Sequence, residues 1–257
     1  MLTMRVFALS DVHIDYDANA QWIANVSLAD YQDDVLILAG DVTDVRARLA
    51  WCIRVLARRF KHVLFVPGNH DLWVIREDEG TTSLQKFDEL RTVVSESGAS
   101  MDLFRDAGVS IVPLLAWYDY SFGEPCDELR SKWMDFRACR WPRGYTEHEI
   151  VSYFTSLNPV DVHEIGGDTV ITFSHFVPRI DVMPQNIPRA QQVLNPILGS
   201  AGLERQLRSF NPLIHVYGHS HINRYVTIDG VSYVNNAFGY PHETRTTSKE
   251  LLCIHEC

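Results

Sequence analysis

Residues 35–44 read VLILAGDVTD, and this stretch decides the fold. Its first five residues, 35–39, are all apolar, and Gly40 and Asp41 follow them without a spacer. A short continuous apolar run of this kind is typical of a strand that is buried on both faces of its sheet. Two other stretches read as strands that stop abruptly: residues 5–10, which a polar turn follows, and residues 62–66, which end at Pro67-Gly68.

Segments with helical spacing separate these strands, which predicts parallel strands joined by right-handed crossovers. We expect helices over residues 19–31, 49–60, 83–97, 146–157 and 203–210. We expect the later strands over residues 109–117, 169–173, 213–217, 225–228, 231–234 and 251–255. The dipeptide Asp229-Gly230 between two of these strands is a strong hairpin signal. Helical connections early in the chain and hairpins late in it favour two mixed sheets packed face to face.

The composition narrows the classes of function. The chain has 257 residues, with 23 Lys and Arg against 33 Asp and Glu, and therefore a formal net charge of −10. Its hydrophobic content of 46% suits a globular protein that buries a full core. Because negative charge repels phosphate backbones and anionic lipids, we expect neither nucleic acid nor a membrane as a partner. No apolar run reaches the ~20 residues that span a bilayer.

The cysteines indicate the compartment. There are five of them, an odd number, and no two form a C-x-x-C pair. This usage is typical of reduced thiols rather than of a disulfide framework. The apolar start of the chain ends at Asp11, which is too early for a signal peptide. We therefore expect a cytoplasmic protein.

Polar residues follow the ends of five predicted strands: Asp11 and His13, Asp41, Asn69 and His70, His175, and His219 and His221. Loops at the carboxyl ends of strands converge in a crevice, where α/β sheets bind their ligands. Apart from His70, these side chains offer two carboxylates, one amide oxygen and four imidazoles, which suits two divalent cations such as Mn, Fe or Zn. A lone Asp41 between two sites can bridge them. Two ions ~3.5–4 Å apart can hold a hydroxide for in-line attack at phosphorus.

The full series of motifs is Asp11-x-His13, Gly40-Asp41-x-x-Asp44, Gly68-Asn69-His70-Asp71, His175 and Gly218-His219-x-His221. In order, spacing and placement it resembles the calcineurin-like metallophosphoesterase superfamily over residues 11–221. The resemblance implies an αββα sandwich of two mixed β-sheets flanked by helices, as one domain over residues 1–257. It further implies a hydrolase of phosphomonoesters or phosphodiesters, in which a metal-bridging hydroxide attacks in line.

The resemblance also implies a role for each residue. The ligands of the first metal are Asp11, His13, Asp41 and His221. The ligands of the second metal are Asp41, Asn69, His175 and His219, so that Asp41 bridges the two ions. His70 stands at the leaving-group oxygen, and Asp44 forms a hydrogen bond that orients it. Asn69 and His70 also contact the substrate, a phosphate-ester small molecule or a nucleotide.

The chain departs from one branch of the superfamily. Protein Ser/Thr phosphatases carry Arg directly after the second Asp of the G-D-x-x-D motif and Glu after G-N-H, where this chain has Val45 and Asp71. The missing arginine argues against a phosphoprotein phosphatase. Arg179, four residues after His175, is the best-placed substitute, because Arg grips phosphate bidentately. Two alternatives stay open: a cyclic-nucleotide phosphodiesterase, and a non-catalytic metal-binding scaffold with this fold.

Two segments lie outside the motif series. An aromatic-rich insertion covers residues 118–145, and a loop with four prolines covers residues 176–200, which we expect to be mostly irregular. The aromatic side chains of the insertion can stack on a nucleobase, or Trp133, Phe136 and Trp141 can pack a small core of their own. We favour the packing interpretation.

Overall fold

The computed structural model describes residues 3–159 and 168–257 of the chain. The first half contains β1 (Arg5–Leu9), α1 (Asp17–Ala24), β2 (Val35–Leu38), α2 (Arg46–Ala57), β3 (His62–Phe65), η1 (His70–Leu72), α3 (Ser83–Ser97), β4 (Phe104–Asp106) and β5 (Val109–Pro113). The second half contains α4 (Asp127–Lys132), α5 (Asp135–Ala138), α6 (Glu147–Ser156), β6 (Thr169–Phe173), η3 (Ile180–Val182), η4 (Gln192–Ile197), α7 (Ala201–Ser209), β7 (Ile214–Tyr217), β8 (Arg224–Ile228), β9 (Val231–Asn235) and β10 (Leu252–Glu256).

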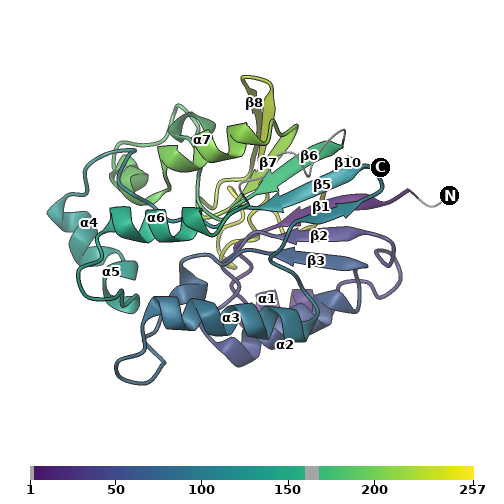
Figure 1. Ribbon diagram of the computed structural model, residues 1–257, viewed down its shortest axis with the longest axis horizontal. Helices are drawn as coiled ribbons and strands as arrows, with labels where there is room; N and C mark the ends of the chain where they lie inside the picture. The colour runs from purple at the N-terminus through teal and green to yellow at the C-terminus, as the bar shows by residue number, and fades with distance from the viewer. Residues whose placement is uncertain (1–2, 160–167) are drawn as a thin grey trace.

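The strands form two mixed sheets, as predicted. One sheet has the order β10-β1-β2-β3, and the other has the order β4-β5-β6-β7-β9-β8. Strands β1, β2 and β3 are parallel to one another, as are β5, β6, β7 and β9. The antiparallel strands β10, β4 and β8 lie at the sheet edges. The parallel strands of each sheet therefore end together, and the loops that follow them meet on one side of the molecule (Figure 1).

Alternate residues of each strand face two different layers. Val6 and Ala8 of β1 pack with Ile171 of β6 and Val216 of β7, in a core that lies between the sheets. Phe7 belongs to a second core, which contains apolar side chains of the helices. Because both faces of these strands are covered, their sequences are apolar without alternation. The result is the helix–sheet–sheet–helix layering that the sequence predicts.

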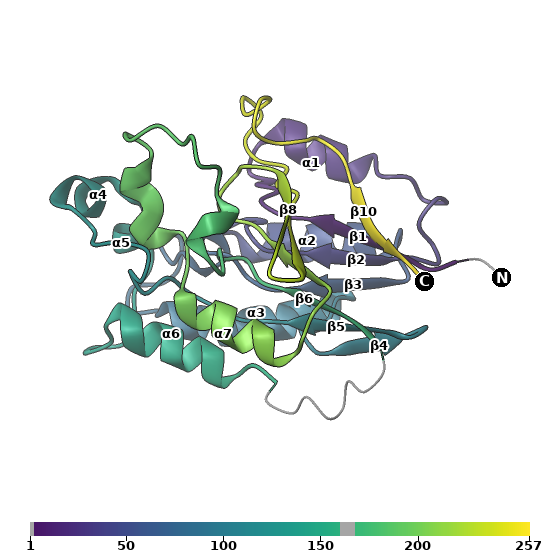
Figure 2. The ribbon, with the colours of Figure 1, turned by 90° about the horizontal axis from the view of Figure 1, so that it is seen from above.

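The helices cover the outer faces of the sheets. Helices α1, α2 and α3 lie on the side of the four-stranded sheet, and α6 and α7 lie together on the other side (Figures 1 and 2). The Gln206 amide of α7 joins the latter pair by donating to the carbonyl of Thr155 at 3.1 Å. Helix α3 begins with a capping box formed by Thr82 and Gln85 and ends at Gly98, whose φ of 97° requires glycine. Its predicted bounds, 83–97, are confirmed.

Two predicted elements are shorter than expected. The helix expected over 19–31 ends at Ala24, because the Arg59 guanidinium donates to the carbonyls of Ala24 and Val26 and so satisfies the helix end. The strand expected over 109–117 ends at Pro113. Beyond it, the N–H and C=O of Leu115 bond to the side chain of Asn158 instead of to a strand.

The aromatic-rich insertion packs on the body of the protein. Trp141 contacts Trp117 at 4.9 Å and Phe154 at 6.2 Å between ring centroids. The proline-containing loop holds only the short 3₁₀ turns η3 and η4, as its composition predicts. All five cysteines have free thiols. Within the described residues, no helix has the length and apolar character needed to cross a membrane.

Candidate metal centre

The structure brings the strand-end residues together in space. They follow β1 (Asp11, His13), β2 (Asp41), β3 (Asn69, His70), β6 (His175) and β7 (His219, His221). Four of them, Asp11, His13, Asp41 and His221, place one ligand atom each within 4.8 Å of one another. Asp41, His175 and His219 form a second such group. We call these the first and second ligand groups.

In the first ligand group, the candidate ligand atoms approach each other closely. His13 Nε2 lies 3.1 Å from His221 Nε2, and His221 Nε2 lies 3.3 Å from Asp11 Oδ1. Asn69 adjoins the second group, because its Oδ1 lies 3.2 Å from His175 Nε2 and 2.9 Å from His219 Nδ1. A cation placed among these atoms could accept a lone pair from each of them. The donor set of oxygen and imidazole nitrogen therefore fits divalent metal ions.

Asp41 lies between the two groups. Its Oδ2 faces the first group, 4.0 Å from His13 Nε2, and its Oδ1 faces the second, 3.5 Å from His175 Nε2. The backbone N–H of His70 donates to Oδ1 at 2.9 Å and holds the carboxylate in this orientation. One carboxylate thus presents a separate oxygen to each ligand group, which is one arrangement in which a carboxylate can bridge two ions.

The outer nitrogens of three histidines are bonded to oxygen acceptors. His175 Nδ1 contacts the carbonyl of Ala39 at 2.8 Å, and His219 Nε2 contacts that of Ile197 at 3.0 Å. His221 Nδ1 contacts Glu243 Oε2 at 2.7 Å. Each contact places a proton on the outer nitrogen. The neutral rings of His175 and His219 then offer the lone pair of the inner nitrogen, and His221 would lose its second proton on binding a cation. Such contacts are the usual way in which proteins orient metal-binding imidazoles.

Burial determines the charges at the site. It lowers the pKa of His13, His175 and His219, so that these imidazoles are neutral and ready to bind a cation. Burial also acts against the charge on His221, but Asp11 and Glu243 outweigh it and raise the pKa of His221 to about 10. Burial, with Asp11 and Asp71 nearby, raises the pKa of Asp41. Bound cations would remove this penalty by favouring the ionised carboxylates.

The backbone at the site is strained. Five of the seven candidate ligands have left-handed backbone angles: Asp11 (φ 53°), His13 (43°), Asp41 (55°), His219 (67°) and His221 (50°). Non-glycine residues rarely adopt this conformation, and such residues concentrate at functional sites. The backbone at Gly68 and Gly218 also lies very close to the carboxylates of the site. A Cβ at Gly68 would lie 2.1 Å from Asp41 Oδ1, and one at Gly218 would lie 2.7 Å from Asp11 Oδ2. These contacts explain the glycines of the motifs.

Asp71 organises the loop around Asp41. Its buried carboxylate accepts the backbone N–H groups of Gly68, Asp41, Val42 and Thr43 at 2.8–3.0 Å. Burial raises the pKa of Asp71 to about 6, although all four N–H donors act in the opposite direction. Sequence analysis noted Asp71 only as a departure from the phosphatase motif. The structure shows that it ties the loops after β2 and β3 together.

Asp135, which lies in the aromatic-rich insertion at the start of α5, is a site residue that the sequence motifs do not predict. Its buried carboxylate accepts Asn69 Nδ2 at 3.0 Å, Trp73 Nε1 at 2.7 Å and Trp133 Nε1 at 2.7 Å. The first contact turns the Asn69 amide so that its oxygen faces the second ligand group. The second fixes Trp73, whose ring stacks on His70 with centroids 3.7 Å apart. Asp135 follows no strand and belongs to no motif, so no sequence signal marks it.

Glu243 is a further residue that sequence analysis missed. Besides His221, its carboxylate accepts the backbone N–H of Tyr240 at 2.8 Å. The Tyr240 ring lies 4.5 Å from that of His13 and 4.9 Å from that of His221. The loop after β9 therefore supports the first ligand group from outside. Its position 22 residues beyond His221 hides this contact from motif analysis.

The expected contact between Asp44 and His70 is absent from the described residues, which corrects that prediction. The Asp44 carboxylate instead accepts Arg76 Nε at 2.8 Å, and its carbonyl accepts Lys86 Nζ at 2.6 Å. An arginine close in space is a stronger partner for this carboxylate than a neutral imidazole. Burial and then the neighbouring His175 lower the pKa of His70 to about 3, so the ring is neutral. Trp73, rather than Asp44, positions it.

Among the described residues, Arg179 makes no hydrogen bond or ion pair with a member of the ligand groups, contrary to its expected role in binding phosphate. Its guanidinium pairs with Asp181 at 2.6 Å, Asp229 at 3.0 Å and Glu204 at 3.2 Å. Three carboxylates hold it beside the β8–β9 hairpin. Arg46 is engaged in the same way, by Glu77 and Glu89.

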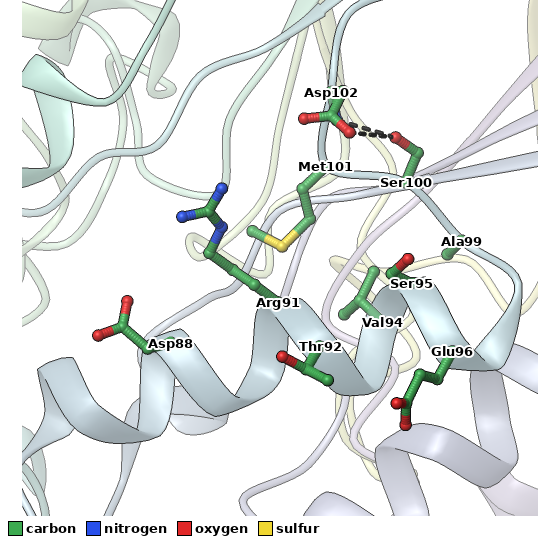
Figure 3. Close-up of a pocket in the computed structure, with 10 residues that line it drawn as sticks. All are labelled: Asp88, Arg91, Thr92, Val94, Ser95, Glu96, Ala99, Ser100, Met101 and Asp102. Atoms are coloured by element: carbon green, nitrogen blue, oxygen red, sulfur yellow. Dashed lines mark hydrogen bonds between the residues drawn. The ribbon is translucent and has the colours of Figure 1, made fainter.

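A separate cavity lies along α3, with a volume of about 660 Å³ (Figure 3). Its lining includes Arg91, Asp88 and the hydrogen-bonded pair Ser100 and Asp102. It contains no histidine, no cysteine and none of the strand-end residues. This cavity is therefore separate from the two ligand groups.

The fold and site define the class of the protein. The model of the family described as calcineurin-like phosphoesterase matches residues 4–223, so the chain belongs to this family and is a phosphoric ester hydrolase. A curated relative is the [acyl-carrier-protein] phosphodiesterase PptH of Mycobacterium tuberculosis. PptH is 26% identical over 269 residues, which cover 93% of this chain and 79% of PptH.

The structure resembles that relative as well. The crystal structure of phosphopantetheinyl hydrolase (PptH) from Mycobacterium tuberculosis superimposes with a TM-score of 0.77 and 25% identity, over 98% of this chain and 96% of that one. A second solved structure shares the fold, with a TM-score of 0.52 and 15% identity over 92% of this chain and 91% of that one. The predicted superfamily and fold class are both confirmed.

Proposed function

We propose that the protein is a phosphodiesterase with a dinuclear metal centre, built by the two ligand groups around Asp41. The observation that carries this proposal is the placement of Asp41, with one oxygen toward each group. Asp11, His13 and His221 complete the first site, and Asn69, His175 and His219 complete the second. Mn, Fe and Zn all suit these donors. The five free thiols support a cytoplasmic location.

Two divalent ions would supply a nucleophilic water at neutral pH and balance the charge of the phosphoryl oxygens. In the hydrolysis, water adds to phosphorus, one P–O ester bond breaks, and the departing oxygen takes up a proton. His70 is the candidate donor at that oxygen, because its ring is partly exposed and lies 3.8 Å from Asp41 Oδ2. A neutral imidazole carries one N–H, which is sufficient for this hydrogen bond. Trp73 and Asp135 hold the ring in place.

Two observations favour a diester over a monoester. Within the described residues, no Lys or Arg side chain contacts a candidate ligand, and Arg179 is held by three carboxylates. A diester carries one negative charge where a monoester carries up to two, so it needs less help from cationic side chains. PptH is named as an acyl-carrier-protein phosphodiesterase and a phosphopantetheinyl hydrolase. The phosphopantetheinyl group on an acyl-carrier protein is therefore the natural substrate that we propose.

The experiment is a comparison of ester hydrolysis with added Mn²⁺, with metal content measured on the same samples. Bis-p-nitrophenyl phosphate, p-nitrophenyl phosphate and a 2′,3′-cyclic nucleotide serve as substrates for the wild type and for His70→Ala and Asn69→Ala. We expect the wild type to hydrolyse the bis ester fastest of the three, and both variants to hydrolyse it more slowly. A metal-loaded wild type that hydrolyses none of the substrates would contradict the proposal. A clear preference for the cyclic nucleotide would instead favour a cyclic-nucleotide phosphodiesterase.

A further inference from the structure

A small cavity of about 240 Å³ adjoins the first ligand group. We call it the side pocket. Three segments line it: residues 183–198 of the proline-containing loop, residues 220–222 after β7, and residues 243–246 after β9. At about 30 Å³ per water molecule, it has room for roughly eight waters, or for part of an extended chain.

The side pocket and the candidate metal centre share a wall. His221, a ligand of the first group, lines the pocket together with Glu243, its partner at 2.7 Å. The inner nitrogen of this imidazole faces Asp11, and its outer nitrogen faces the carboxylate. A group in the pocket therefore lies one side chain away from a phosphate held at the ligand groups.

The lining suits an uncharged chain that carries amides. One part is aliphatic, with Met183, Ile187 and Leu194 among its members. Another part offers the side-chain amides of Gln191 and Asn195, which make no hydrogen bond to any other residue that the structure describes. Amide side chains can donate and accept at once, so they match a peptide-like group in a ligand.

The same lining disfavours other classes of ligand. The described lining contains no Lys or Arg, and the charge of its one basic side chain, His221, is already paired with Asp11 and Glu243, so little there would balance a second phosphate or a carboxylate. It contains no Phe, Tyr or Trp, so it offers no face on which a nucleobase would stack. These two absences separate it from a pocket for a nucleotide, whose base and phosphates need such partners.

We propose that the side pocket binds an amide-bearing aliphatic chain attached to one ester oxygen of the phosphodiester, and that this selects substrates of the pantetheine type. This inference rests on the proposed function for the position of the phosphate. Pantetheine has the required chemistry, because it is an uncharged chain with two amide bonds and an aliphatic segment. Specificity arises because a chain seated beside His221 delivers its phosphate to the metal centre.

The test is calorimetric titration of free pantetheine into the Mn²⁺-loaded protein. Leu194→Trp fills the side pocket, and Leu28→Trp is the matched control, since Leu28 is 64% exposed and lies outside the pocket. Asn195→Leu removes one amide without adding much bulk. We expect the wild type and the control to bind pantetheine alike. We expect Leu194→Trp to bind it about tenfold more weakly or worse, and Asn195→Leu to lie between.

The outcomes are distinct from those of the ester assay. Equal binding of pantetheine to the wild type and to Leu194→Trp, in samples shown to be folded by urea titration, overturns the inference. So does the absence of pantetheine binding in the wild type, or binding of adenosine that Leu194→Trp abolishes. Failure of the proposed function appears elsewhere, as a metal-loaded wild type without activity on any ester. The titration measures the affinity of the side pocket for pantetheine and does not require turnover.

Discussion

Replacing Asp135 by Asn tests how the insertion supports the metal centre. In the wild type, Oδ1 accepts N–H groups of Asn69 and Trp73, and Oδ2 accepts that of Trp133. Asparagine has one oxygen and one NH₂ group in place of the two oxygens. In either orientation of the new amide, at least one buried N–H then faces another donor.

The magnitude follows from that count. One unmade hydrogen bond of a buried donor costs about 1–3 kcal/mol. If the amide keeps its oxygen at the Oδ1 position, Trp133 loses its partner and stability falls by about that amount. If it turns the other way, Asn69 and Trp73 lose theirs, and the Asn69 oxygen is no longer directed at the second ligand group. Loss of such a support typically weakens metal affinity by about 10–100-fold.

The assay is calorimetric titration of Mn²⁺ into chelator-treated protein, with urea unfolding of the same samples. Asp102→Asn is the matched control, because Asp102 is exposed and, among the residues that the structure describes, forms side-chain hydrogen bonds with Ser100 alone. We expect Asp135→Asn to weaken one of two Mn²⁺ sites and to lower turnover of the bis ester, whereas the control changes neither. A folded Asp135→Asn protein that binds both ions with wild-type affinity would refute the role given to Asp135.

Three further predictions follow from the site and its surroundings. His70→Ala should lower kcat on the bis ester by about 10²–10⁴-fold with unchanged metal content, whereas a loss of metal would show that His70 is structural. Arg179→Ala should leave kcat/KM unchanged. It should lower the unfolding free energy by only about 1 kcal/mol, because ion pairs with mostly exposed partners contribute little to stability. A large loss of activity would instead support a role for Arg179 in phosphate binding. Burial lowers the pKa of His215 to about 3, below its ordinary value near 6.5, so the unfolded chain takes up the proton first and stability falls as pH drops below about 6.5. His215→Gln should reduce the stability lost between pH 7.5 and 5.5 by about 1 kcal/mol in urea titrations, and an unchanged slope would contradict this.

Much of the candidate site could be predicted because its residues follow strands directly. Asp41 comes three residues after the end of β2, and His175 two residues after the end of β6. A strand whose end is predicted correctly therefore also gives the position of the candidate ligand that follows it. The parallel strands then bring these positions to one edge of each sheet. This reasoning needs only local pattern and the direction of each strand.

The errors arise where side chains compete for partners. The spacing Gly40-Asp41-x-x-Asp44 places Asp44 near the site, but spacing cannot show that Arg76 takes its carboxylate. Arg179 follows β6 as expected, yet Glu204 and Asp229 come from α7 and from the β8–β9 turn. Asp135 reaches Asn69 across 66 residues of sequence. Such contacts depend on how distant segments pack, which no local pattern encodes.

The central claim is that one chain holds two ions on either side of Asp41. Anomalous difference density at the manganese edge, from crystals grown with Mn²⁺, tests it most directly. We predict two peaks per chain, one bounded by Asp11, His13 and His221 and the other by Asn69, His175 and His219, with the Asp41 carboxylate between them. A single peak, or two peaks that do not share Asp41, would contradict the account.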